Sequence, residues 1–120
     1  MKSKPALGAW GEAIAAEALK ARGFTVVEQN YRSRYGEIDI IAENREYLVF
    51  AEVKLRKSTY FGAAREFVDA RKQERLRATA SMWLEEHETS LQPRFDVIEV
   101  YGEEGAAAPR IRQIENAFGG

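Results

Sequence analysis

The sequence predicts one three-layer α/β domain, in which helices flank a mixed β-sheet. The hydrophobic pattern gives the element order α-β-β-β-α-β-β, and a three-strand meander framed by helices packs in this way. A chain of 120 residues fits a single domain with one modest core. Its content of 45% hydrophobic and 31% charged residues is typical of a globular protein.

The first half of the chain is predicted to contain one helix and three strands. The alanine-rich residues 4–22 have a helical pattern, and Gly23 provides the stop signal. Apolar runs bounded by polar or glycine-containing turns predict the strands. These strands are residues 24–30, 37–42 and 47–54, separated by turns at 33–36 and 43–46.

The second half is predicted to cross over through a long helix. Residues 55–62 are polar and irregular and should form a loop, whereas residues 63–88 carry apolar side chains at helical spacing. This crossover allows the fourth strand to run parallel to the third. Pro93 breaks the chain before that strand, and the remaining predicted segments are strands at 94–101 and 111–114, a loop at 102–109 and frayed ends at 1–5 and 115–120.

The composition restricts the chemistry that this chain can support. It has no cysteine and one histidine, His87, which excludes disulfides, thiolate zinc sites, cysteine nucleophiles and the usual Ser–His triad. Carboxylates remain, and they prefer hard cations such as Mg²⁺ or Mn²⁺. A net charge of −1 argues against tight nonspecific nucleic-acid binding, but it is compatible with a local basic stripe beside an acidic pocket.

The sequence carries no signal for a membrane. No apolar run approaches the roughly 20 residues that a membrane-spanning helix needs. Residues 1–5 start basic but lead into an amphipathic segment, without the apolar stretch of a signal peptide. We therefore expect no membrane partner and a cytoplasmic location.

Two carboxylates and a lysine lie inside the most apolar strand segments. Asp39 lies between two isoleucines, and Glu52 and Lys54 belong to the apolar run 48–54. A charged group in such a strand loses its hydration and must be paired or bound to a metal. Because side chains alternate across a strand, Glu52 and Lys54 share one face. Asp39, Glu52 and Lys54 therefore predict a functional site in which the charges are paired with one another or bound to a metal.

The register of the hairpin decides which acid of the second strand faces Glu52. A loop of residues 44–47 puts Asp39 opposite Glu52, whereas a tighter turn would put Glu37 there. Two like charges directly opposite each other are destabilising, and a divalent cation would remove this conflict. Lys54 could then hold a phosphate oxygen, orient the attacking water or stabilise developing charge.

These residues also have an ordinary structural interpretation, in which Asp39 caps a turn and Glu52 and Lys54 form a salt-bridged sheet edge. The apolar runs around both acids favour the metal site over this alternative. Glu12 is a further candidate, because it falls in the apolar sector of its helix. Glu12 could reach the metal directly or through water. The alternative interpretation is that Glu12 is an ordinary acid in the first turn of the helix, where the helix dipole favours it.

Basic residues border the predicted site. Arg32 and Arg34 flank the turn before the acidic strand, and Arg56 and Lys57 follow the third strand. Lys72 lies on the long predicted helix. These residues could bind phosphates around an acidic floor, although basic residues on the helix could also form a solvated face balanced by acids.

The spacing resembles the PD-(D/E)xK nuclease motif of the restriction-endonuclease-like fold, with Asp39 followed by Glu52-Val53-Lys54. The match is closer to the YraN family of bacterial endonuclease-like proteins and covers nearly the whole chain to Tyr101. The matching stretches are Gly11-Glu12, Gly23-Phe24, Asn30-Tyr31-Arg32, Gly36-Glu37-Ile38-Asp39, Phe50-Ala51-Glu52-Val53-Lys54-Leu55-Arg56, Lys72 and Arg94-Phe95-Asp96-Val97.

The resemblance implies a site and an activity. The family is similar to archaeal Holliday-junction resolvases, which implies a Mg²⁺- or Mn²⁺-dependent endonuclease acting on DNA, including branched or otherwise structured DNA. Asp39 and Glu52 would hold the metal together with the Val53 carbonyl. Lys54 would position the nucleophilic water or stabilise charge, and Glu12 would assist through water.

Two other functions remain as alternatives. A non-catalytic nucleic-acid-binding or adaptor module would keep the fold without cleavage. A purely structural protein would use the acids in internal salt bridges. The near-neutral charge favours a homodimer with a composite basic surface, or a protein partner, for any function that involves DNA.

Overall fold

The structure is a computed structural model that describes residues 6–56, 69–102 and 109–118. Lys57, the expected loop at 57–62 and the expected helical residues 63–68 lie outside the described residues. The observed elements follow the predicted order and are α1 (Ala6–Ala21), β1 (Thr25–Ser33), β2 (Gly36–Glu43), β3 (Tyr47–Arg56), α2 (Ala70–Glu86), β4 (Gln92–Tyr101) and β5 (Arg110–Ile114).

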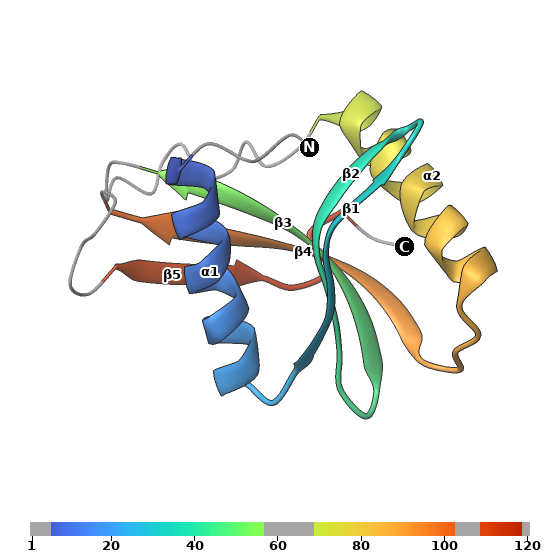
Figure 1. Cartoon of the computed structure of the whole chain (residues 1–120), viewed down its shortest axis with the longest axis horizontal. Coiled ribbons are helices and arrows are strands. Elements are labelled where there is room, and N and C mark those ends of the chain that lie inside the picture. Colours follow the sequence, from blue (N-terminus) through green and yellow to red (C-terminus); the bar gives the residue numbers. More distant parts are fainter. Residues whose placement is uncertain (1–5, 57–68, 103–108, 119–120) are drawn as a thin grey trace.

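The strands form one five-stranded mixed sheet in the order β1-β2-β3-β4-β5. The pairs β1/β2, β2/β3 and β4/β5 are antiparallel, and β3/β4 is parallel. The parallel pair is joined by the crossover that contains α2, as the sequence predicted (Figure 1). The predicted mixed α/β architecture is therefore confirmed.

Apolar clusters on both faces of the sheet hold the layers together. On β3, Val49 and Ala51 pack with Leu19 and other residues of α1, whereas Leu48 and Phe50 pack with α2. Because successive side chains of a strand point to opposite faces, α1 and α2 cover opposite sides of β3. Within the described ranges, no helix combines the length and apolar character needed to cross a membrane.

Close packing of α1 on β3 depends on Gly11. A Cβ atom at this position would clash with the side chain of Leu55. The missing side chain lets the helix backbone approach the strand. This contact places α1, and with it Glu12, beside the end of β3 that carries the predicted site.

The helix α2 begins at Ala70, inside the range 63–88 that the sequence predicted as one helix. Asp69 is the N-cap, with extended φ and ψ of −77° and 172°, and its side chain accepts a hydrogen bond from the Lys72 N–H. An aspartate in this position satisfies a backbone donor of the first turn. At the other end, His87 stacks on Trp83 with ring centroids 3.8 Å apart, which fits a packing role.

Strand ends differ from the predictions where pairing outweighs local polarity. β3 includes Leu55 and Arg56, which were expected to start a loop, because β4 pairs with the strand as far as Arg56↔Tyr101. β1 likewise runs to Ser33. β4 begins at Gln92 and contains Pro93, since proline is tolerated at the start of a strand.

The last described residues pack on the domain, although residues 115–120 were expected to fray. Phe118 lies 5.0 Å from Phe95 between ring centroids, and its carbonyl accepts a hydrogen bond of 2.9 Å from Arg77. This aromatic contact packs the turn against β4, which the local sequence did not predict.

The strands β2 and β3 diverge after a short ladder. Their recorded pairs run from Glu43↔Leu48 to Ile40↔Ala51. Beyond that point β2 continues beside β1, and β3 continues beside β4. Figure 1 shows the β1–β2 hairpin bending toward α2 while β3 and β4 extend the other way. We call this divergence the fork.

Candidate active site at the fork

Asp39 and Glu52 are the first residues of the two strands beyond the last ladder pair. Asp39 Oδ2 accepts a hydrogen bond of 2.8 Å from the Val53 N–H. A side chain therefore satisfies a backbone donor on β3 that faces the fork. The N–H and C=O of one strand residue point to the same edge, so the Val53 carbonyl also faces Asp39.

The observed hairpin register shows that Asp39, and not Glu37, lies opposite Glu52. Continuing the pairs from Ile40↔Ala51 sets Asp39 opposite Glu52, as the loop of residues 44–47 predicted. Glu37 instead faces Arg32 on β1, with Arg32 Nε 3.5 Å from its carboxylate. Asp39 is therefore the acid that shares the fork with Glu52.

Glu52 is buried at the fork, with 9% of its surface exposed. Its Oε2 accepts a hydrogen bond of 2.7 Å from Lys72 Nζ of α2. Burial raises the pKa of Glu52, and the nearby Asp39 raises this pKa further, while Lys72 and Lys54 oppose the shift. Since burial and repulsion win over the lysines, additional positive charge beside this carboxylate would be stabilising.

We expect Glu52→Gln to stabilise the metal-free protein. A raised pKa means that the folded state holds the proton more tightly than the unfolded state, so stability falls as pH rises above the ordinary value of 4.5. The variant should unfold with a free energy about 1 kcal/mol higher at neutral pH, or a Tm roughly 4 °C higher. Scanning calorimetry in EDTA, from acidic to neutral pH, measures this difference.

The matched control is Glu37→Gln, because this carboxylate lies on the adjoining strand but is partly exposed. It should change stability far less, and the gain from Glu52→Gln should vanish at acidic pH. A loss of stability in Glu52→Gln at neutral pH would show that the Lys72 ion pair outweighs burial.

Lys54 is half-buried on the same strand face as Glu52. It lies two residues along β3, and its charge opposes the rise in the pKa of Glu52. In the parallel ladder its partner is Glu99 of β4. The predicted acid–acid–lysine arrangement is thus brought together at one place.

Glu12 is buried, with 5% exposed, among Ala15, Ala16 and Leu19 of α1. This agrees with the apolar sector predicted for it. Among the described residues, no set of three or more Asp, Glu, His or Cys side chains is arranged to hold a metal. Glu12 therefore does not form such a set with Asp39 and Glu52.

The predicted basic residues divide between the two sides of the fork. Arg32 and Arg34 belong to the β1–β2 hairpin, where Arg34 Nη2 donates a hydrogen bond of 2.9 Å to the Tyr35 hydroxyl. Arg56 lies on β3, and Lys72 bonds Glu52 directly from α2. The structure thus gives Lys72 a contact inside the site, closer than the rim position predicted for it.

Sequence reasoning missed the buried acids of β4. Asp96 and Glu99 are fully buried, and both lie in the apolar run Phe95-Asp96-Val97-Ile98-Glu99-Val100. The signal that identified Glu52, a charge inside an apolar strand, would also have found them. Their partners include Arg94 and Tyr101 on β4 itself, but others come from β3 and β5 and are not predicted by the local sequence.

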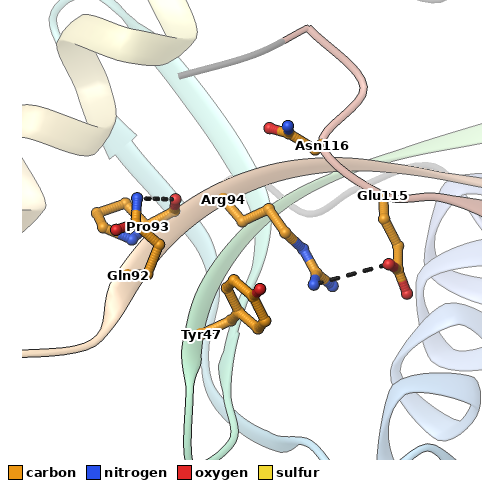
Figure 2. A pocket seen from close by; sticks show the side chains of 6 residues that line it. All are labelled: Tyr47, Gln92, Pro93, Arg94, Glu115 and Asn116. Atoms are coloured by element: carbon orange, nitrogen blue, oxygen red, sulfur yellow. Dashed lines mark hydrogen bonds and ion pairs between the residues drawn. The ribbon is translucent and has the colours of Figure 1, made fainter.

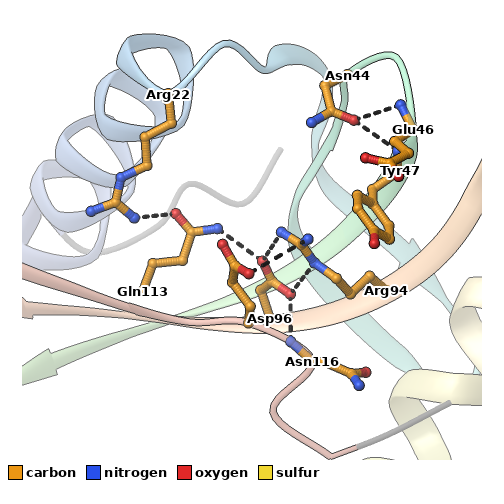
Figure 3. Close-up of polar contacts among 9 residues, drawn as sticks. Arg22, Asn44, Glu46, Tyr47, Arg94, Asp96, Gln113 and Asn116 are labelled. Atoms are coloured by element: carbon orange, nitrogen blue, oxygen red, sulfur yellow. Dashed lines mark hydrogen bonds and ion pairs between the residues drawn. The ribbon is translucent and has the colours of Figure 1, made fainter.

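Asp96 anchors a polar network on β4, where it pairs with Ala51 of β3 (Figure 3). It accepts hydrogen bonds from Arg94 Nε and Nη2 at 3.0 and 2.9 Å, from Gln113 Nε2 at 2.8 Å and from the Asn116 N–H at 3.0 Å. Gln113 is also bonded to Arg22, the residue that directly follows α1. These contacts join β4, β5 and the end of α1, which is a structural role.

A pocket of about 370 Å³ lies beside this network (Figure 2). Its lining residues are Tyr47, Gln92, Pro93, Arg94, Glu115 and Asn116. The guanidinium of Arg94 lies 4.5 Å from the Tyr47 ring and 3.8 Å from Glu115. Its charge is already paired with carboxylates, so the pocket offers no strong anion site and is separate from the fork.

The fold and the fork define the class of this molecule: an α/β protein with a buried carboxylate pair and adjacent lysines where two strands of a mixed sheet separate. The model of the "Uncharacterised protein family UPF0102" matches residues 11–100. The chain belongs to this family, which is the YraN family indicated by the motifs.

Curated relatives cover almost the whole chain. A UPF0102 protein of Frankia casuarinae is 42% identical over 119 residues, which span 98% of this chain and 100% of the relative. One from Beutenbergia cavernae is 44% identical over 109 residues, or 90% and 92% of the two chains. One from Syntrophomonas wolfei is 39% identical over 113 residues, or 93% and 96%. Their names assign no activity, so function has to be argued from the site.

Proposed function

We propose that this protein is a metal-dependent endonuclease that hydrolyses phosphodiester bonds in DNA. The observation that carries the proposal is the buried pair Asp39–Glu52, in which neighbouring charge and burial raise the pKa of Glu52 despite two lysines. A divalent cation would relieve this conflict. The donor set is all oxygen, which suits Mg²⁺ or Mn²⁺.

The metal would be held by Asp39, Glu52 and the Val53 carbonyl. Mg²⁺ commonly binds one or two protein carboxylates and completes its shell with water and substrate phosphate, so a third carboxylate is not needed. When bound, the ion would polarise the phosphate and lower the pKa of a bound water. Glu12 would contribute from outside this shell, through water.

The lysines have different roles in this proposal. Lys54, next to Glu52 on the same strand face, would hold the attacking water or stabilise the charge that develops on the phosphate. Lys72 would keep Glu52 ionised and oriented through its 2.7 Å hydrogen bond. Lys72 is thus a positioning residue, whereas Lys54 is a catalytic residue.

The proposed substrate is DNA, with branched forms included. Arg32, Arg34 and Arg56 would bind phosphates on the two sides of the fork, together with Lys57. The near-neutral net charge of −1 supports a homodimer with a composite basic surface, or a protein partner. The proposal includes a cytoplasmic location.

The test is cleavage of linear, flapped and four-way DNA with Mn²⁺, with Mg²⁺ and with EDTA. Wild type should cut at least one substrate in a metal-dependent manner, and Glu52→Ala should not. Mn²⁺ titration by calorimetry should show binding that Glu52→Ala abolishes. Equal cleavage by wild type and Glu52→Ala would refute this mechanism, and Glu37→Ala is the control that should keep activity.

One observation favours a second function, a non-catalytic nucleic-acid-binding module. Lys72 already partly neutralises Glu52 in the absence of any metal. In that case DNA binding would be salt-sensitive and independent of Mn²⁺, and no substrate of the panel would be cut. The same experiment therefore separates the two functions.

A further inference from the structure

Basic residues of β3 and β5 lie in two rows on the sheet face that carries Glu52. The pairing registers align Lys54, Glu99 and Arg112 in one row, and Arg56, Tyr101 and Arg110 in the next. Aligned partners point their side chains to the same face. These rows directly follow the row of Glu52, so we call them the basic rows.

The charge of the basic rows is unbalanced. Their six residues comprise four cations, Lys54, Arg56, Arg110 and Arg112, and one carboxylate, Glu99, which leaves a local charge of +3. This excess contrasts with the net charge of −1 for the whole chain. Basic residues therefore outnumber acidic residues in these two rows.

Glu99 forms ion pairs with two arginines of the basic rows, Arg56 and Arg112. It is fully buried, and its oxygens lie 3.4 Å from Arg56 Nη2 and 3.8 Å from Arg112 Nη1. The Tyr101 hydroxyl donates a hydrogen bond of 2.9 Å to the same carboxylate. A single buried acid thus anchors one arginine from β3 and one from β5.

The anchored arginines still reach solvent. The side chain of Arg56 is 26% exposed and that of Arg112 is 46% exposed, and Arg110 is exposed as well. The ion pairs with Glu99 therefore leave the side chains of Arg56 and Arg112 partly exposed to solvent. Arginine suits phosphate in particular, because its planar fork of donors binds two oxygens at once.

We propose that the basic rows bind the phosphates of the DNA strand that enters the fork, with Arg110 and Arg112 of β5 as sequence-independent contacts. This inference rests on the proposed function and extends its substrate surface by one further strand of the sheet. Because β3 and β5 are separated by one strand, the rows span about 10 Å. One DNA strand carries about three phosphates over that axial length.

The test compares DNA binding by wild type and by the double variant Arg110→Ala/Arg112→Ala. Fluorescence anisotropy with a labelled duplex and a four-way junction, in Ca²⁺ and between about 50 and 200 mM salt, gives the salt dependence. Removing two phosphate contacts should weaken binding of both DNAs at low salt by about tenfold or more. The slope of log K against log salt should fall by about 2.

Arg45→Ala is the matched control, because Arg45 is exposed in the turn at the opposite end of β3. It should leave the slope unchanged. The double variant should keep its Mn²⁺ titration, since Arg110 and Arg112 lie away from the metal ligands. It should still unfold cooperatively, with a lower Tm from the loss of the Arg112–Glu99 ion pair, because Arg56 continues to pair with Glu99.

The outcomes separate DNA binding by the basic rows from the proposed nuclease activity. A reduced slope without any metal-dependent cleavage supports the basic rows and refutes the nuclease. An unchanged slope in the folded double variant, with cleavage intact, refutes the basic rows alone. Absence of DNA binding by wild type, or binding of RNA in preference to DNA, also overturns the inference.

Discussion

Replacing Lys54 with alanine is expected to lower the rate of Mn²⁺-dependent cleavage by about 10²–10³-fold, because a preorganised positive charge next to the reacting phosphate is lost. Lys54 lies on the same face of β3 as Glu52, two residues away. Single-turnover kinetics with saturating enzyme measures the chemical step without a contribution from binding. Mn²⁺ affinity should change little, since an ammonium group is not a metal ligand.

Lys72→Ala is the informative comparison for Lys54→Ala. The hydrogen bond and charge of Lys72 lower the pKa of Glu52 against the effects of burial and Asp39. Without Lys72 this pKa rises further, so metal binding and cleavage should require a higher pH. The acidic limb of the pH–rate profile should shift upward, and activity should recover at alkaline pH.

The two lysine variants should therefore differ in how they respond to pH. Lys54→Ala should stay inactive across the whole profile, whereas Lys72→Ala should approach wild type when Glu52 is ionised. If Lys54→Ala recovered at alkaline pH and Lys72→Ala did not, the catalytic and positioning roles would have to be exchanged.

Asp96→Ala should cause the largest loss of stability, about 3–5 kcal/mol in the free energy of unfolding. The fully buried Asp96 accepts hydrogen bonds from Arg94, Gln113 and the Asn116 N–H. Truncation leaves the guanidinium of Arg94, whose side chain is 11% exposed, without its main counter-ion. Urea denaturation should show a much lower midpoint at an unchanged m value.

Glu115→Ala provides the control for this stability prediction. Its carboxylate also approaches Arg94, at 3.8 Å, but 65% of the side chain is exposed. Exposed ion pairs are weak, so this change should stay within about 0.5 kcal/mol. Equal effects of the two substitutions would show that charge near Arg94, and not burial of Asp96, determines stability.

Local sequence patterns were sufficient for the order of elements and for singling out Glu52 and Lys54, and they left Asp39 and Glu37 as alternatives. The patterns are short-range: an isoleucine on each side of Asp39, and an apolar run around Glu52. They failed at boundaries set by distant partners. β3 extends to Arg56 because β4 pairs with it. The start of α2 at Ala70 was missed for another reason, since its N-cap Asp69 is a local signal that was not used.

In the candidate site, too, local sequence predicted some features, whereas contacts between residues far apart in the sequence were not predicted. The pairing Glu43↔Leu48 and the exclusion of Glu37 follow from one hairpin register, which the sequence narrowed to two choices. The contact of Lys72 with Glu52 joins a helix to a strand 20 residues away. No local pattern predicts a contact of that kind.

The sequence by itself determined that charged residues stand in buried strands, and that such charges require compensation because hydration is lost there. Only the tertiary structure decided what compensates each one. Glu52 received Lys72, Asp96 received Arg94 and two groups near β5, and Glu99 received arginines from two strands. The physical reason is that burial is encoded along each strand, whereas the partner of a buried charge is set by sheet order and register.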